Sequence, residues 1–293
     1  MSALPPCPAC GGAFGAPAPY PGGAAHAATL SFEHIVACGA CGLGMALPRY
    51  AQSVLDAFYA GGAYWNDAVG HSRPQVLHER NQCRHRVRHV MEALAHDVRP
   101  TVLDVGAGHG WTGDFLERLY PGRVRRFDFI EPDEGLSREI LTRKARFGKR
   151  RLASLEAAEG GYHAIFLNHV LEHVAEPLEC VRRVTALLAP GGVAYFETPY
   201  ADQRFKGDVF PHTWFFTPDA LAQIARRAGL TEVLRAAFGR MPGNTGADRM
   251  WRAAFRASAE LNLADLAGRF DDRVWRYAPG ADGIWLRWMV SRA

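Results

Sequence analysis

Four cysteines near the N-terminus have the type and spacing of metal ligands. Cys7 and Cys10 lie in "CPACGG", and Cys38 and Cys41 lie in "CGACGLG". This spacing lets both thiolates of a pair face one ion, and the following glycine lets backbone amides face the sulfurs. Four thiolates suit tetrahedral Zn²⁺ and leave no open position, so the predicted zinc site is structural. A redox dithiol needs only one pair, and disulfides are rare in the cytoplasm, where we expect this chain.

The stretch "TVLDVGAGHGWT" combines an acidic side chain with three alternating glycines. It predicts a buried strand ending near Asp104 and a turn through Gly106, Gly108 and Gly110. Such turns hold nucleotide-like ligands. Trp111 stands where a dinucleotide fingerprint has its third glycine, and the G-K-[ST] of a phosphate loop is missing. A carboxylate here repels a pyrophosphate and favours a cationic ligand, such as a sulfonium with an ammonium group.

Alternating strands and helices must position these side chains. Apolar patterns predict strands at 101–106, 123–133, 162–170, 191–199, 231–239 and 283–292, and helices at 76–98, 111–120, 134–147, 176–190 and 217–230. The alternation indicates an α/β, Rossmann-like doubly wound sheet, mostly parallel, with helices on both faces. Ligands bind beyond the carboxyl ends of such strands, where Asp104, Glu131 and Asn168 fall. We expect the basic run 143–151 to be a solvated helix end and loop.

Five motifs in order resemble those of the class I S-adenosylmethionine-dependent methyltransferases. "VLDVGAGHG" is similar to their first motif, "FLNHVLEHVAEP" to the segment after their fourth strand, and "LLAPGGVAYFETP" to their fifth strand. The resemblance implies that Glu131 of "IEPD" takes both ribose hydroxyls, which two acceptor oxygens can do, beside Pro132. It places Leu155 of "ASLE" near the adenine and Asn168 in the cofactor site. Asp104 and Glu131 could each cap a turn, but their joint placement after successive strands favours cofactor contact.

Side chains after the fourth and fifth strands are the candidate catalytic residues. Methyl transfer from a sulfonium needs an aligned acceptor and, for a hydroxyl, removal of its proton. His169, Glu172 and His173 follow the fourth strand, with the last two at the predicted start of a helix, and His212 follows the fifth. A lone histidine is more often structural. The placement of His173 and His212 beyond adjacent strands favours a catalytic role.

The cysteine segment joined to this core resembles the sugar C-methyltransferases that act on nucleotide-linked deoxysugars. There, an H-E-H segment before an aromatic run carries the acid and base. "FPHTWFFT" keeps the last histidine as His212, but Pro211 replaces the glutamate, and this chain is much shorter. His173 matches another histidine of that family. O-methylation of a saccharide or of another natural-product hydroxyl is therefore expected at least as strongly as methylation of carbon.

We expect three parts along the chain. Residues 1–48 form the zinc-ribbon-like segment, 49–100 an aromatic linker and lead-in helix, and 101–293 the methyltransferase core. An insertion at about 241–282, rich in Arg and Trp, is interpreted as a substrate lid whose arginines could hold a diphosphate. The aromatic residues of "LDAFYAGGAYWND" either cover the cofactor and stack on a sugar or join the zinc segment to the core.

The composition agrees with a globular enzyme that acts on a small molecule. Of 293 residues, 48% are hydrophobic and 22% charged, and the net charge is +4. No apolar run could cross a membrane, and no secretory signal begins the chain, which favours the cytoplasm. A zinc-bearing ribosomal RNA guanine methyltransferase is the alternative, but no basic stripe interleaves with aromatics, so nucleic acid is not the expected partner. A non-catalytic adaptor is a third hypothesis, disfavoured because the cofactor motifs are intact.

Overall fold

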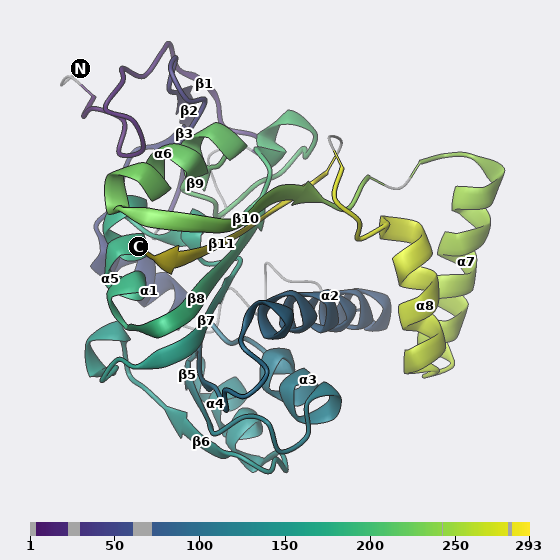
Figure 1. The fold of residues 1–293 in the computed structure, drawn as a ribbon. Coiled ribbons are helices and arrows are strands. Elements are labelled where there is room, and N and C mark those ends of the chain that lie inside the picture. Colours follow the sequence, from purple (N-terminus) through teal and green to yellow (C-terminus); the bar gives the residue numbers. More distant parts are fainter. Residues whose placement is uncertain (1–3, 23–29, 61–71, 242, 281–282) are drawn as a thin grey trace.

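A seven-stranded sheet forms the centre of the molecule (Figure 1). The computed structural model describes residues 4–22, 30–60, 72–241, 243–280 and 283–293. In spatial order the strands are β10 (Leu230–Phe238), β11 (Trp285–Arg292), β8 (Leu188–Pro199), β7 (Tyr162–Asn168), β4 (Thr101–Val105), β5 (Arg126–Ile130) and β6 (Gly148–Arg151). The strands β4 to β8 are parallel, whereas β11 is antiparallel to both neighbours. The predicted mostly parallel, doubly wound α/β fold is confirmed.

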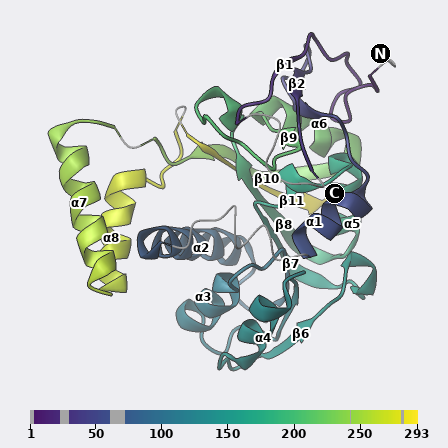
Figure 2. The same cartoon turned by 180° about the vertical axis from the view of Figure 1, so that it is seen from behind.

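Helices cover both faces of this sheet (Figures 1 and 2). One face carries α2 (Arg73–Ala93), α3 (Trp111–Leu119) and α4 (Glu134–Thr142), and the other carries α5 (Pro177–Ala186) and α6 (Pro218–Ala228). Successive strand residues point to opposite faces, so an entirely apolar strand fills two cores.

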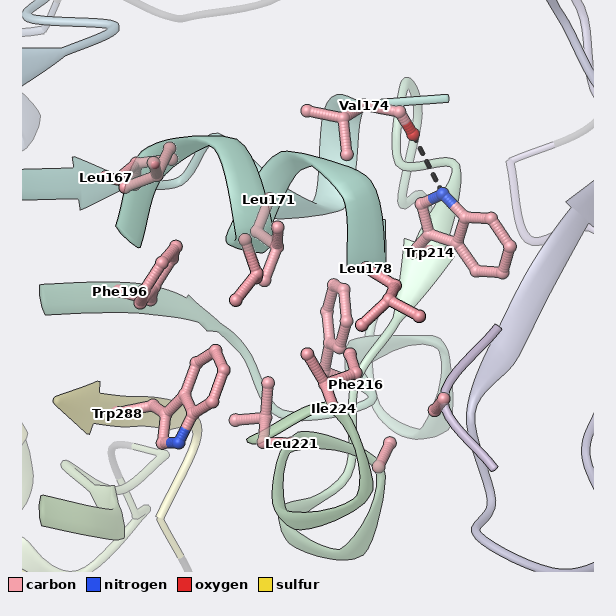
Figure 3. Close-up of a cluster of buried hydrophobic side chains, with 14 of the residues drawn as sticks. Leu167, Leu171, Val174, Leu178, Phe196, Trp214, Phe216, Leu221, Ile224 and Trp288 are labelled. Atoms are coloured by element: carbon pink, nitrogen blue, oxygen red, sulfur yellow. Dashed lines mark hydrogen bonds between the residues drawn. The ribbon is translucent and has the colours of Figure 1, made fainter. Parts of the chain in front are cut away.

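The side chains of β7 and β8 show this division directly. Phe166 and Tyr195 belong to the core beneath α2, α3 and α4. The next residue of each strand, Leu167 or Phe196, belongs to the opposite core, where Trp288 of β11 also packs (Figure 3). That second core extends beneath the turn that follows β7.

Two segments differ from their predicted structure. The sequence "GKRR" of β6 was expected in a loop, but it pairs with β5 as an edge strand, and Arg150 donates to Asp128 across the pair at 2.9 Å. Its polar sequence carries no strand signal because the edge is solvated. Pro190 and Gly191 were expected to stop a helix; they lie inside β8, and α5 ends earlier.

The N-terminal segment forms a small sheet that incorporates a strand of the core. The strands β1 (Ala18–Pro19), β2 (His34–Ala37) and β3 (Gly44–Leu47) are antiparallel, and β3 also pairs with β9 (Trp214–Phe215). Helix α1 (Gln52–Ala60) follows this sheet. The segment is thus built into the core through a strand that lies far away in the sequence.

A helical hairpin occupies the predicted insertion between β10 and β11. It consists of α7 (Gly246–Glu260) and α8 (Ala264–Trp275) and stands beside one end of α2 (Figure 2). The fully buried Asp271 of α8 hydrogen-bonds to His78 at 2.9 Å and accepts from Asn81 at 2.8 Å, both on α2. The sequence predicted the insertion but not its helices.

Candidate active site

The glycine turn joins β4 to α3 and contacts the turn that follows β7. Gly106, Gly108 and Gly110 have φ angles of 69°, 52° and 71°, which side chains disfavour. A Cβ atom on Gly106 would lie 2.6 Å from Cγ2 of Val170. Glycine is therefore required here because two turns meet, and the predicted cofactor turn adjoins the predicted catalytic segment.

Asp104 presents a buried carboxylate whose oxygens lack a well-formed hydrogen bond among the described residues. Its side chain is 1% exposed, and burial raises its pKa from 3.8 to about 7, although the nearby Thr112 hydroxyl and Arg86 act in the opposite direction. A buried carboxylate that lacks a partner is costly, and a bound cation removes that cost. The site therefore fits the cationic methyl donor inferred from the sequence.

The other predicted cofactor residues follow the carboxyl ends of β5, β6 and β7. Glu131 accepts backbone hydrogen bonds from Gly108 at 2.7 Å and from Asp133 at 2.9 Å, which leaves each oxygen a second lone pair. Burial raises the pKa of Glu131. Asn168 ends β7 with a buried Oδ1 that has no partner among the described residues. Two positions are less enclosed, the exposed Pro132 and the half-buried Leu155, which begins η2 (Leu155–Ala157).

The residues after β7 form a tight turn where the sequence predicted the start of a helix. His169 has a φ of 54°, and η3 (Leu171–His173) is a single 3-10 turn that ends before α5. The Nδ1 atom of His169 lies 3.1 Å from Glu172, and its Nε2 lies 3.5 Å from Glu197. Burial lowers the pKa of His169, but these two carboxylates outweigh burial and raise it. His169 is thus held between two carboxylates.

The structure brings His173 and His212 together. Their ring centroids are 5.0 Å apart, and with Glu172 they place three ligand-type atoms within 4.8 Å of one another. His173 Nδ1 lies 2.7 Å from the Tyr59 hydroxyl, and burial lowers the pKa of His173 to about 3. His212 Nδ1 lies 3.4 Å from Asp202. Burial raises the pKa of Asp202, but His212 and Lys206, whose Nζ lies 2.8 Å away, together outweigh burial and lower the pKa to about 2, so Asp202 is charged beside His212.

Three residues around the site were not singled out from the sequence. Asp202 follows β8 closely, and its place beyond a strand end was an available signal. Arg86 of α2 and Arg287 of β11 both bind the fully buried Glu197, at 2.9 Å and 2.6 Å. These partners lie far apart in the sequence, so no local pattern shows the pairing. Tyr64 and Trp65, for which the sequence left open a role in the pocket or in joining the N-terminal segment to the core, lie outside the described residues.

The four N-terminal cysteines converge. Their sulfur atoms lie within 4.8 Å of one another, with Cys7 to Cys41 at 3.7 Å and Cys10 to Cys38 at 3.4 Å. Tetrahedral Zn²⁺ with Zn–S bonds of about 2.3 Å requires S–S edges of about 3.8 Å. The amide of Gly12 faces the Cys10 sulfur at 3.4 Å, as the motif predicts. The geometry and the soft donors fit zinc.

Fold and site together define a class I methyltransferase, and the chain belongs to the methyltransferase domain family, whose model matches residues 77–235. The chain is similar to the ubiquinone biosynthesis O-methyltransferase of Ruegeria pomeroyi, with 31% identity over 208 residues, 62% of this chain and 83% of that one. The enzyme of the same name from Xanthomonas axonopodis pv. citri is 31% identical over 157 residues, 51% of this chain and 62% of that one. The chain is therefore an S-adenosylmethionine-dependent methyltransferase, as the sequence predicts.

Solved structures show the same fold at low identity. A Leishmania major S-adenosylmethionine-dependent methyltransferase has a TM-score of 0.51 at 18% identity, over 81% of this chain and 83% of that one. A plantazolicin methyltransferase in complex with SAH has a TM-score of 0.50 at 11% identity, over 82% of this chain and 97% of that one. In the described part of the chain, no helix has the length and apolar character needed to cross a membrane.

Proposed function

We propose that this enzyme methylates a hydroxyl group of a small molecule, with His212 as the general base. The observation that carries the proposal is the His212–Asp202 pair beside His173 in a turn that contacts the glycine turn. The O-methyltransferase names of the relatives support an oxygen acceptor. Sugars, nucleotide sugars and other natural products are the proposed acceptor class.

S-adenosylmethionine supplies, when bound, a methyl group on a positively charged sulfur. We assign Asp104 to the cationic part of the donor and Glu131 to the ribose hydroxyls, since each offers a buried carboxylate. Pro132 and Leu155 would border the adenine, and the unpartnered Oδ1 of Asn168 would accept from the donor's amino group. The glycine turn admits the ligand close to the backbone.

We assign different roles at the acceptor to His212 and His173. Asp202 orients Nδ1 of His212 and stabilises the imidazolium, so Nε2 is the nitrogen that takes the acceptor's proton. His173, with a pKa of about 3, is too weak a base at neutral pH. Neutral and hydrogen-bonded to Tyr59, it would instead orient the acceptor oxygen. Glu172 and His169 hold the turn in place.

Replacement of the base tests this proposal. We expect His212→Ala to lower kcat by roughly 10²–10⁴-fold with an unchanged Kd for S-adenosylhomocysteine, because only proton removal is lost. Labelled methyl transfer to nucleotide sugars, glycosides, phenols and total RNA measures kcat, and calorimetry measures Kd. His34→Ala, at an exposed position of β2, is the control. Wild-type kcat in His212→Ala would refute the base assignment, and absence of S-adenosylmethionine binding would favour the adaptor hypothesis.

We also propose that the four cysteines bind one structural Zn²⁺. Four thiolates close the coordination sphere, so the ion would hold the two knuckles together and touch no substrate. Elemental analysis of the purified chain should give one zinc per chain, and Cys38→Ser should release it. Stoichiometric zinc in that variant would contradict the assignment.

A groove between α2, α3 and α8 favours an anionic acceptor as the second candidate. Five arginines line it: Arg80, Arg84, Arg88, Arg118 and Arg269. Two of them are neutralised, Arg84 by Asp272 at 2.6 Å and Arg118 by Asp265 at 2.8 Å. The groove could bind the diphosphate of a nucleotide sugar beneath the hairpin, in keeping with the lid hypothesis. It could instead bind RNA. An affinity for RNA that falls steeply with salt would favour RNA.

A further inference from the structure

The segment that carries His212 is held by the zinc segment. It spans residues 209–217 and includes β9, which pairs with β3 through Gly44 and Phe215. The amide of Ala46 donates to the Thr213 carbonyl at 2.9 Å, and the Thr217 hydroxyl donates to the Cys41 carbonyl at 2.6 Å. These contacts come from the second cysteine knuckle and from the strand β3 that follows it. The backbone on either side of His212 thus depends on N-terminal residues.

Tyr20 makes the contact closest to His212. Its hydroxyl shares one proton between the carbonyls of Val209 at 3.0 Å and His212 at 3.1 Å. The side chain is buried, and its ring stacks on Phe32 with centroids 5.1 Å apart. Burial raises the pKa of Tyr20 well above its ordinary value, so the hydroxyl stays protonated and remains a donor. Tyr20 therefore sets the position of the backbone of His212 itself.

The opposite side of this segment is bound to the turn after β7. The indole nitrogen of Trp214 donates to the Val174 carbonyl at 2.8 Å (Figure 3). The Thr213 hydroxyl donates to the Glu172 carbonyl, also at 2.8 Å. His212 thus lies between two anchors, one from the zinc segment and one from the turn that carries His173. The distance between the two histidines depends on both.

We propose that Tyr20 is a positioning residue for His212, through which the zinc segment completes the active site. The inference rests on the proposed function of His212 as the base. Its physical basis is that small displacements of a catalytic group reduce the rate strongly, even when the substrates still bind. Within the described part of the chain, Tyr20 has no hydrogen bond or ring contact with the cofactor residues or with the side chain of His212, so its effect would pass through the backbone.

The test is a double-mutant cycle with Tyr20→Phe and His212→Ala. Phenylalanine keeps the ring packing and removes only the donor. We expect Tyr20→Phe to lower kcat roughly tenfold, with unchanged zinc content and an unchanged Kd for S-adenosylhomocysteine. In the His212→Ala background the same change should alter kcat by less than about twofold, because the positioned group is already absent.

Tyr50→Phe is the matched control. The Tyr50 hydroxyl also binds backbone, donating to the Ser31 carbonyl at 2.8 Å, and its ring packs on the same Phe32. Among the described residues, its hydroxyl bonds Ser31 and no residue of the His212 segment, so kcat should stay at the wild-type level. Equal losses in both tyrosine variants, or a tenfold loss that persists in the His212→Ala background, would overturn the positioning role. A wild-type kcat in His212→Ala alone would instead refute the proposed base.

Discussion

We expect the charge of Asp104, the proposed contact of the cationic donor, to decide how pH acts on cofactor binding. Burial raises its pKa from 3.8 to about 7, so the carboxyl is protonated and uncharged below neutral pH. A cationic ligand binds only the ionised form tightly. Affinity for S-adenosylmethionine should therefore rise by up to about tenfold per pH unit between pH 5.5 and 7, and then level off. Calorimetric titrations across this range measure the slope.

Asp104→Asn separates this effect from the rest of the site. The variant should bind S-adenosylmethionine weakly and with little dependence on pH. Since the folded protein binds the Asp104 proton more tightly than the unfolded chain does, ionisation reduces stability as pH rises from about 4 to 7. The ligand-free variant should thus melt at a higher temperature than the wild type at pH 8. Asp114→Asn on α3 is the control, and a steep pH dependence that survived in Asp104→Asn would exclude Asp104 as its source.

Elements with strong apolar periodicity were predictable, and those defined by distant partners were not. The strands that contain Asp104 and Asn168 have mostly apolar sequences, and their polar ends predict the candidate site from the sequence. The strand β6, in contrast, forms by pairing with the free edge of β5. The strand β9 likewise forms by pairing with β3. Such pairings depend on tertiary contacts that local composition does not encode. For the same reason, the sequence does not predict the contacts between the N-terminal cysteine segment and the backbone around His212.

The buried carboxylate of Asp271 joins the hairpin α7–α8 to α2. We expect these hydrogen bonds to determine the local stability of the hairpin. Asp271 also accepts from the Tyr277 hydroxyl at 2.8 Å, so Asp271→Ala removes three hydrogen bonds between buried groups of α2, α8 and the segment that follows. We expect amide exchange in α8 to accelerate about thirtyfold or more, equivalent to roughly 2 kcal/mol of local stability. Asp265→Ala, also on α8, removes an exposed ion pair with Arg118 of α3 and should leave exchange unchanged. Equal exchange rates in the two variants would show that Asp271 does not hold the hairpin.

The ion pairs of Glu197 join distant parts of the whole molecule. The carboxylate lies in β8, and its partners Arg86 and Arg287 come from α2 and β11, on opposite sides of it in the sequence. It also faces His169 at 3.5 Å. One side chain thus links the strands β8 and β11, the helix α2 and the turn after β7. A change at this position should therefore alter both global stability and the active site.

The variant Glu197→Gln tests how much the ion pairs of Glu197 with Arg86 and Arg287 contribute to stability. Burial raises the pKa of Glu197, but Arg86 and Arg287 outweigh burial and hold it well below 4.5. Its ionisation therefore stabilises the fold above about pH 4.5, and this contribution disappears as the pH falls below that value. The variant should lose about 3–5 kcal/mol of unfolding free energy at pH 7, because two buried guanidinium groups lose their counter-charge, and its acid transition should flatten.

Glu159→Gln, which breaks only the exposed pair with Arg150, should unfold like the wild type in urea titrations at pH 7 and pH 4. If both variants unfolded alike, Glu197 would contribute no more than a surface charge, and the junction between helix, sheet and active site would have to depend on apolar packing alone.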